Sequence, residues 1–137
     1  MTRYLLDTNV VSELRKTTPH GAVTAWLQGL RDEQICISAV TVGELQAGVE
    51  RTRRQDPIKA GEIEAWLARV EALFSLLSMD VACFREWSRL MEDKPGAIEI
   101  DAMIAATARV HGLTVATRNE KDFKRFGVAM MNPFKAS

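Results

Sequence analysis

Four acidic residues stand at positions from which a folded α/β chain could bring them together. Asp7 directly follows a short apolar segment, and Asp101 lies in the first turn of an expected helix. Glu44 lies in the second turn of another expected helix, and Asp122 comes shortly after a later apolar segment. Because ligands of open α/β sheets bind beyond the carboxyl ends of the strands, we expect these four side chains to share one crevice.

Carboxylates that share a crevice repel one another strongly in a low dielectric, so such a site needs a cation. Neither histidine nor cysteine belongs to the set, and an all-oxygen set selects a hard ion such as Mg²⁺ or Mn²⁺. A hard ion of this kind can activate water and stabilise the in-line displacement of a phosphodiester. The residues therefore indicate metal-dependent phosphate chemistry.

Each acid also has a purely structural interpretation. Asp7 could be the N-cap of the helix that follows it, and Thr41 with Glu44 forms a T-x-x-E capping box. Asp101 could favour the positive end of its helix, and Asp122 could cap a turn. The functional interpretation rests on the four positions taken together.

Basic residues gather next to the expected crevice although the chain carries no net charge. Arg118, Lys121, Lys124 and Arg125 follow the last-but-one expected strand, where phosphates would be held. A second group, at positions 51, 53 and 54, has the pattern of a solvated helix face. The balance of 18 Lys and Arg against 18 Asp and Glu neither favours nor excludes nucleic acid.

Several enzyme classes are excluded by what the sequence lacks. The two histidines fall in a turn (His20) and at a helix end (His111), which disfavours Ser-His-Asp and Cys-His catalysis. The phosphate-binding pattern G-x-x-x-x-G-K-[ST] and the zinc patterns CxxC and HExxH do not occur. Cys36 and Cys83 lie in apolar contexts without metal spacing, so we expect two buried free thiols in a reducing cytosol.

The elements that must position these residues alternate along the chain. We expect strands at 4–6, 35–37, 75–79, 113–116 and 128–131, and helices at 10–14, 22–30, 38–53, 57–72, 80–91 and 98–111. This alternation predicts an α/β fold with a central, mostly parallel sheet flanked by helices.

The length of 137 residues and the 47% hydrophobic content predict a single domain over residues 1–137. With a carboxylate at position 7 and no apolar run long enough to span a membrane, we expect a cytoplasmic protein.

Four short motifs, in this order, resemble the signature of the PIN-domain family. They are Leu5-Leu6-Asp7-Thr8-Asn9, Ser38-x-x-Thr41-x-x-Glu44-Leu45, Asp101-Ala102-x-Ile104-Ala105-Ala106 and Thr117-Arg118-Asn119-x-x-Asp122-Phe123. The segment Gly43-Glu44-Leu45-Gln46-Ala47-Gly48 and the ending Asn132-Pro133-Phe134 are similar to VapC toxins, especially the FitB-like subgroup. The resemblance extends from Tyr4 to Phe134.

This resemblance implies a Mg²⁺- or Mn²⁺-dependent endoribonuclease, the toxin of a type II toxin–antitoxin pair. It implies a homodimer that a small VapB- or FitA-like antitoxin neutralises, with promoter DNA bound only through that antitoxin. RNA is then the substrate, and no membrane is involved.

The resemblance also implies roles for individual residues. Asp7, Glu44 and Asp101 become the acidic triad, with Asp7 and Asp101 as direct metal ligands and Glu44 as a ligand directly or through water. Many family members have Asp where this chain has Asn119, so Asp122 is expected to serve as the fourth acid, and a second metal ion stays an open question. The residues expected to support the acids or contact substrate are Thr8, Asn9, Thr117, Arg118 and Asn119.

Three other functions compete with this prediction. A catalytically silent PIN domain acting through protein contacts would lack one of the acids, and none is missing. A haloacid-dehalogenase-like phosphatase needs D-x-D, but Asn9 stands at the second position. A receiver-like signalling module needs a phosphoacceptor after the third strand, where only Asp80 is near.

Overall fold

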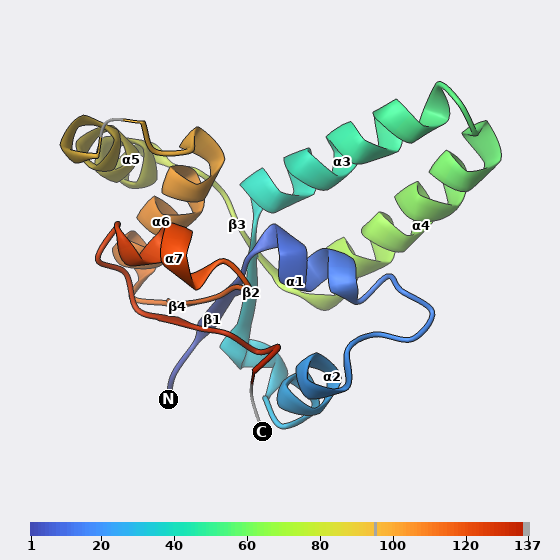
Figure 1. Cartoon of the computed structure of the whole chain (residues 1–137), viewed down its shortest axis with the longest axis horizontal. Coiled ribbons are helices and arrows are strands. Elements are labelled where there is room, and N and C mark those ends of the chain that lie inside the picture. Colours follow the sequence, from blue (N-terminus) through green and yellow to red (C-terminus); the bar gives the residue numbers. More distant parts are fainter. Residues whose placement is uncertain (95, 136–137) are drawn as a thin grey trace.

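The fold is built around five short strands that run parallel. The computed structural model describes residues 1–94 and 96–135. The strands are β1 (Tyr4–Leu6), β2 (Ile35–Ser38), β3 (Ser75–Leu77), β4 (Thr114–Ala116) and β5 (Met130–Met131). They are ordered β3-β2-β1-β4-β5, and all four pairings are parallel, which confirms the predicted α/β sheet (Figure 1).

Helices connect the strands, mostly where the sequence predicts them. They are α1 (Thr8–Glu13), α2 (Gly21–Gln28), α3 (Ala39–Arg53), α4 (Pro57–Leu73), α5 (Val81–Asp93), α6 (Glu99–His111) and α7 (Glu120–Lys124), with a 3₁₀ turn at Asp32–Gln34. The short helix α7 was not predicted, and β3 ends two residues earlier than expected.

Local capping interactions determine where the helices begin and end. Ser38 caps α3 by accepting the N–H of Val40 at 3.0 Å, so the predicted capping box of Thr41 and Glu44 is wrong. The helix starts at Ala39, two residues before Thr41, which places both Thr41 and Glu44 inside the helix. Gly112 ends α6 with a left-handed φ of +66°, as expected of a residue without a Cβ.

Two apolar layers cover the two faces of the sheet. Leu5 faces the layer formed with α5, α6 and α7, whereas the next residue, Leu6, faces the layer formed with α1, α2 and α4. Small side chains of α6, among them Ala102 and Ala105, are fully buried and allow this helix to approach the sheet closely. Both cysteines are buried free thiols, as predicted. No helix in the described residues is long and apolar enough to cross a membrane.

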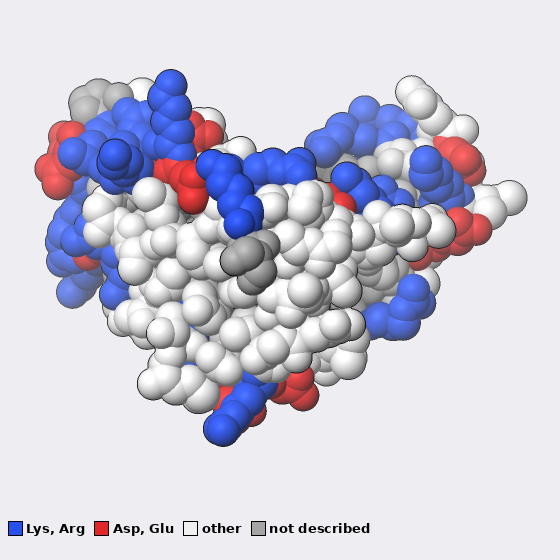
Figure 2. All heavy atoms as spheres, turned by 60° about the horizontal axis from the view of Figure 1, so that its bottom comes forward, with Lys and Arg blue, Asp and Glu red and all other residues white. Residues whose placement is uncertain are grey.

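The strand order creates a crevice at the carboxyl edge of the sheet. From β1 the chain proceeds to β2 and β3 on one side, and then to β4 and β5 on the other side. The α3–α4 pair and the α5–α6 pair extend away from this edge, with α1 and α7 between them (Figure 1). The surface is hollowed between these two lobes, and Lys and Arg side chains line the hollow (Figure 2). The reversal of strand order between β1 and β4 is where α/β sheets bind ligands.

Candidate active site

Asp7 is the most deeply buried of the four acids, and three hydrogen bonds hold its carboxylate. It follows β1 directly and is 4% exposed. Its Oδ1 accepts the N–H of Thr8 at 2.8 Å, whereas Oδ2 accepts the Thr117 hydroxyl at 2.8 Å and the Asn9 amide at 3.1 Å. The predicted capping role is therefore real, and it begins α1 at Thr8 rather than near position 10. One carboxylate both caps a helix and forms the floor of the crevice.

Burial raises the pKa of Asp7 above its usual range. The hydrogen bonds from Thr117 and Thr8 oppose this effect, and the negative charges of Glu44 and Asp122 reinforce it. A buried carboxylate beside two other carboxylates gains free energy by binding either a proton or a metal cation.

Asp101 completes the acid cluster, which we define as Asp7, Glu44, Asp101 and Asp122. It is half-buried in the first turn of α6. Its pKa is raised to about 6, first by burial and then by the charges of Asp7, Asp122 and Glu44. Among the described residues, every charge that shifts this pKa is another carboxylate. The structure thus brings the other three predicted acids into electrostatic range of Asp101.

Glu44 is held in the crevice by a threonine from another helix. The Thr8 hydroxyl donates to Oε1 of Glu44, and it lies 3.1 Å from the hydroxyl of Thr41. Thr41 is fully buried on α3, so α1 and α3 meet at this polar contact. Thr8 therefore connects two acids: its N–H binds Asp7, and its hydroxyl binds Glu44.

The segment after β4 forms one wall of the crevice. The buried Thr117 hydroxyl accepts the N–H of Asn119 at 2.9 Å, and the Asn9 side-chain oxygen accepts the N–H of Arg118 at 3.2 Å. Asn119 itself is exposed, whereas Asp122 is half-buried and acts on the pKa of Asp7. Of the two candidates in this segment, Asp122 is therefore the one that belongs to the acid cluster.

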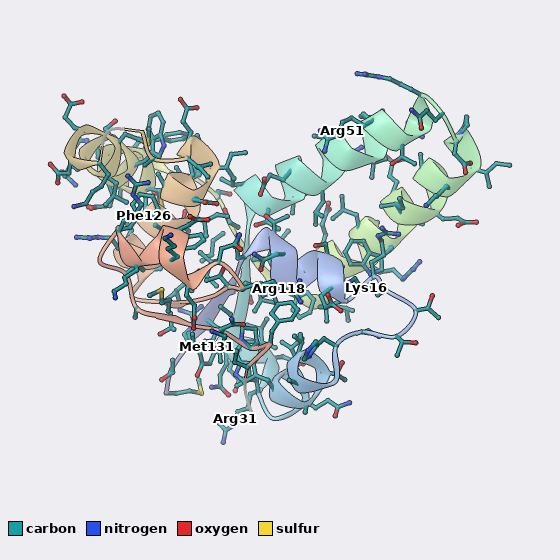
Figure 3. The ribbon with its side chains drawn as sticks, viewed as in Figure 1. Lys16, Arg31, Arg51, Arg118, Phe126 and Met131 are labelled. Carbon is teal, nitrogen blue, oxygen red and sulfur yellow. The ribbon has the colours of Figure 1, made fainter. Side chains whose placement is uncertain are left out.

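Arg118 is exposed and stacks on an aromatic ring. Its guanidinium lies 3.7 Å from the ring centroid of Phe134. In Figure 3 this arginine lies beside α1, between the two lobes. The stacking restricts the side chain and leaves guanidinium N–H groups free to donate.

A pocket between α3 and α6 continues the crevice. It is lined by Val40, Gly43, Glu44, Ala47, Arg51, Ile100 and Met103. Arg51 lies two turns beyond Glu44 on α3 (Figure 3). Arg51 is exposed, as expected of a solvated helix face, whereas the neighbouring Arg53 is half-buried and paired with Glu50 and Glu64.

The acid cluster is open rather than tightly closed. In the part of the chain that the structure describes, no three of its four acids have oxygens that all lie within 4.8 Å of one another. Mg²⁺ usually keeps several of its waters and binds proteins through one or two carboxylates. A spacing of this kind fits a hydrated hard ion better than an ion bound only by protein atoms.

Two features of the structure were not foreseen from the sequence. Glu13 is 5% exposed, and its carboxylate accepts the N–H of His20 at 2.9 Å and pairs with Lys16 at 2.9 Å. Nothing in the local sequence distinguishes it from a solvated glutamate. His111 was interpreted only as a helix-end cation, yet it lies near Cys83 and Asp80.

The chain is a small α/β domain with an acidic crevice at the carboxyl edge of a five-stranded parallel sheet. A crevice of this kind suits a hard cation. The sequence profile described as "PIN domain" matches residues 4–129, so the chain belongs to the PIN-domain family.

Individual relatives agree with this assignment. VapC ribonuclease Y4jK of Sinorhizobium fredii is 35% identical over 96% of this chain and 97% of its own length. Toxin FitB of Neisseria gonorrhoeae is 35% identical over 95% of this chain and 97% of its own. The crystal structure of FitAcB from Neisseria gonorrhoeae superposes with a TM-score of 0.84 at 34% identity, covering 96% of this chain and 99% of that chain. The predicted PIN-like fold and the similarity to VapC and FitB toxins are confirmed.

Proposed function

We propose that the protein is a metal-dependent endoribonuclease that hydrolyses RNA phosphodiester bonds, with one PIN domain over residues 1–137. The observation that carries this proposal is the acid cluster: four carboxylates from separate elements meet at the carboxyl edge of the sheet, where burial and the neighbouring negative charges raise the pKa values of Asp7 and Asp101. Two curated relatives that support it are named as ribonucleases: VapC ribonuclease Y4jK, and the tRNA(fMet)-specific endonuclease VapC of Shigella flexneri at 29% identity.

The residues of the crevice fit Mg²⁺, with Mn²⁺ as the alternative, because every donor is a carboxylate oxygen. Asp7 and Asp101 would hold the ion, with Glu44 binding it directly or through water and Asp122 as the fourth acid. When bound, the ion supplies charge neutralisation at the phosphodiester and a water of lowered pKa.

The remaining residues of the crevice orient these acids and the substrate. Thr117 and Asn9 fix the Asp7 carboxylate through their hydrogen bonds, and Thr8 fixes Glu44. Arg118 is placed on the crevice wall, where its free N–H groups can bind a phosphate of the RNA. Asn119 supports the wall through its backbone N–H.

We further propose that the protein is the toxin of a type II toxin–antitoxin pair in the cytoplasm. FitB is named a toxin, and solved relatives are described as FitAB bound to a DNA fragment and as VapBC bound to promoter DNA. A small VapB- or FitA-like antitoxin would neutralise this chain, which would dimerise and reach promoter DNA only through that antitoxin.

The described residues count against two of the competing functions, the phosphatase and the receiver. Asn9 uses its amide to bind Asp7 and its oxygen to bind the backbone of Arg118, so it holds the crevice together and supplies no second carboxylate for phosphatase chemistry. Asp80 follows an edge strand and caps α5, away from the switch point where a receiver would carry its phosphoacceptor.

The test is RNA cleavage by the purified full-length protein with Mg²⁺, with Mn²⁺ and with excess EDTA. We expect cleavage with either ion and none with EDTA. Asp101→Asn, purified in parallel, controls for contaminating ribonucleases and should be inactive. Undiminished cleavage in EDTA would refute metal dependence, and equal cleavage by Asp101→Asn would refute the active site. Sequencing the RNA ends identifies the cleaved bond, and copurification with any small protein that a neighbouring gene encodes tests the antitoxin.

A further inference from the structure

A second group of metal-binding side chains lies where α5 begins and α6 ends. Asp80 is the N-cap of α5, Cys83 is its third residue, and His111 is the last residue of α6. One ligand atom from each of the three lies within 4.8 Å of the other two. Among the described residues, this is the one group of three or more His, Cys, Asp or Glu side chains that come so close.

The group is separate from the acid cluster. The charge that acts on Asp80 is that of His111, whereas the charges that act on Asp101 are those of the other three acids. Asp80 also follows the edge strand β3, whereas the acid cluster surrounds the central strands. An ion bound at one place therefore does not occupy the other.

The three donors differ in kind, and their combination selects the ion. A thiolate, an imidazole and a carboxylate are the ligands that proteins use for Zn²⁺, which is softer than Mg²⁺. Three protein ligands with a water in the fourth position are a common zinc arrangement. The all-oxygen acid cluster and this mixed group therefore favour different metals.

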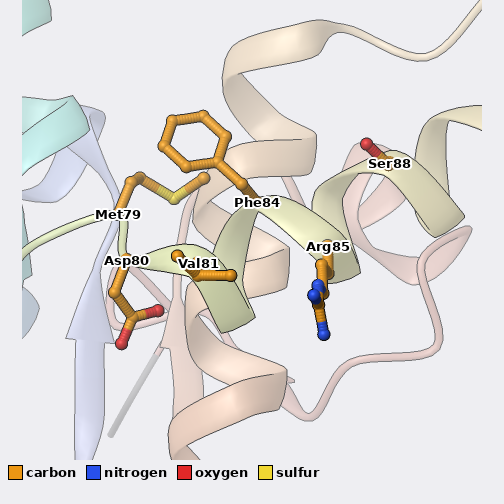
Figure 4. A pocket seen from close by; sticks show the side chains of 6 residues that line it. All are labelled: Met79, Asp80, Val81, Phe84, Arg85 and Ser88. Atoms are coloured by element: carbon orange, nitrogen blue, oxygen red, sulfur yellow. The ribbon is translucent and has the colours of Figure 1, made fainter.

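The local structure holds two of the three donors in place. Oδ1 of Asp80 accepts the N–H of Cys83 at 3.0 Å, which orients the carboxylate and leaves its second oxygen for an ion. The Cys83 thiol is buried next to the Asp80 carboxylate, and it makes a long contact of 4.0 Å with the carbonyl oxygen of Ser78. In the view of Figure 4, the Asp80 side chain points to the opposite side of α5 from Met79 and Phe84, so these apolar side chains leave it free.

The separation of the donor atoms suits an ion after a small adjustment. Donor atoms around tetrahedral zinc lie roughly 3.3–3.7 Å apart, as follows from zinc–ligand distances of about 2.0–2.3 Å. Because the three atoms lie within 4.8 Å of one another, a closure of at most about 1.5 Å is needed. Asp80 and His111 are both exposed, so rotation of their side chains can supply this movement without repacking the core.

We propose that Asp80, Cys83 and His111 form a binding site for Zn²⁺ or a cation of similar softness, with water as the remaining ligand. The bound ion joins the start of α5 to the end of α6. Because the ion binds the folded chain, it stabilises the protein in proportion to its concentration above Kd.

The test is titration of the full-length, chelator-treated protein with Co²⁺, in reducing buffer with excess Mg²⁺ to occupy the acid cluster. We expect one equivalent of Co²⁺ to produce the near-ultraviolet thiolate-to-cobalt band, and Zn²⁺ to abolish it. Cys83→Ser should lose the band, and His111→Gln should weaken Co²⁺ binding at least tenfold. Cys36→Ser, at the other buried thiol, and Asp101→Asn, in the acid cluster, should both keep it.

The exposed position of His111 keeps the proposal testable even if a variant at the buried Cys83 fails to fold. Added Zn²⁺ should raise the melting temperature of the wild type and leave that of His111→Gln unchanged. The absence of a band in the wild type, its survival in Cys83→Ser, or an equal Zn²⁺ shift in His111→Gln would each overturn the site. In that case Asp80 is only a helix cap and Cys83 only a core residue.

Discussion

Replacing Asp101 by Asn should stabilise the metal-free protein at neutral pH while abolishing RNA cleavage. The negative charge of Asp101 is opposed by burial and by three other carboxylates, and its pKa rises to about 6. Asn has nearly the same shape and carries no charge, so the repulsion disappears together with the ligand. The gain in stability and the loss of activity have the same cause.

The size and the pH dependence of this effect follow from the pKa. Between about pH 4 and pH 6 the folded protein binds more protons at Asp101 than the unfolded chain does, so stability falls as the pH rises through this range. A shift from 3.8 to about 6 corresponds to at most about 3 kcal/mol. Solvent screens a half-exposed carboxylate, and roughly 1 kcal/mol is expected to remain. For a chain of this size, that raises the melting temperature by about 3 °C.

The assay is thermal unfolding in EDTA at pH 7.5 and at pH 4, followed by circular dichroism. Asp101→Asn should melt higher than the wild type at pH 7.5 and equally at pH 4, where the carboxyl is already protonated. Glu99→Gln is the matched control, because Glu99 lies in the same helical turn and is exposed. It should show no gain at either pH. Added Mg²⁺ should stabilise the wild type and not Asp101→Asn. A lower melting temperature for Asp101→Asn at pH 7.5 would refute the account and make Asp101 a structural residue.

Three more substitutions test the other parts of the site. Glu44→Gln keeps an oxygen for the Thr8 hydroxyl, so the free energy of unfolding should change by less than about 0.5 kcal/mol. RNA cleavage should nevertheless fall by orders of magnitude, because the negative charge is lost. Near-normal cleavage would show that Glu44 does not belong to the site. Glu44→Ala should lose about 1 kcal/mol of stability in urea denaturation, through the lost hydrogen bond rather than a capping box. Asp7→Asn places an NH₂ group next to the Thr117 hydroxyl and the Asn9 amide, which both need an acceptor. The free energy of unfolding should therefore fall by about 1–3 kcal/mol, whereas Asp101→Asn should raise it. Equal or greater stability of Asp7→Asn would contradict the observed hydrogen bonds. Arg118→Ala should reduce the magnitude of the slope of log K against log salt concentration for RNA binding by about one. Arg31 lies far from the crevice in Figure 3, so Arg31→Ala should leave this slope unchanged. Equal slopes for both variants would mean that Arg118 is a solvated residue without a phosphate contact.

The positions of Asp7 and Asp101 at the carboxyl edge of the sheet follow from local signals in the sequence. Asp7 follows a buried apolar strand, and Asp101 falls in the first turn of a strongly periodic helix. Both features are properties of neighbouring residues, and the rule that ligands bind at the carboxyl edge of the sheet supplies the rest. The parallel sheet follows in the same way from the alternation of strands and helices.

Interactions between distant residues were not predictable in this way. The choice between Glu44 as a cap and Glu44 in the crevice depends on Thr8 reaching across from α1 to donate to the Glu44 carboxylate. Helix α7 is too short for its periodicity to be recognised, and its position depends on packing of Phe123 in the core. The meeting of His111 with Cys83 arises from the packing of α5 on α6, which no spacing in the sequence reveals.

The position of β1 in the middle of the sheet has a consequence for how the protein is made. Asp7 emerges early from the ribosome, but the hydroxyl that orients it belongs to Thr117, and β1 pairs with β4 only after the segment 114–116 has been synthesised. At bacterial-like rates of about 5–20 residues per second, Asp7 precedes Asp122 by roughly 10 s. Before β4 is made, the nascent chain can therefore form at most a half-sheet of β1, β2 and β3, and its acid cluster stays incomplete until Asp122. A truncated or stalled chain that ends before β4 contains at most three of the four acids and cannot assemble the site.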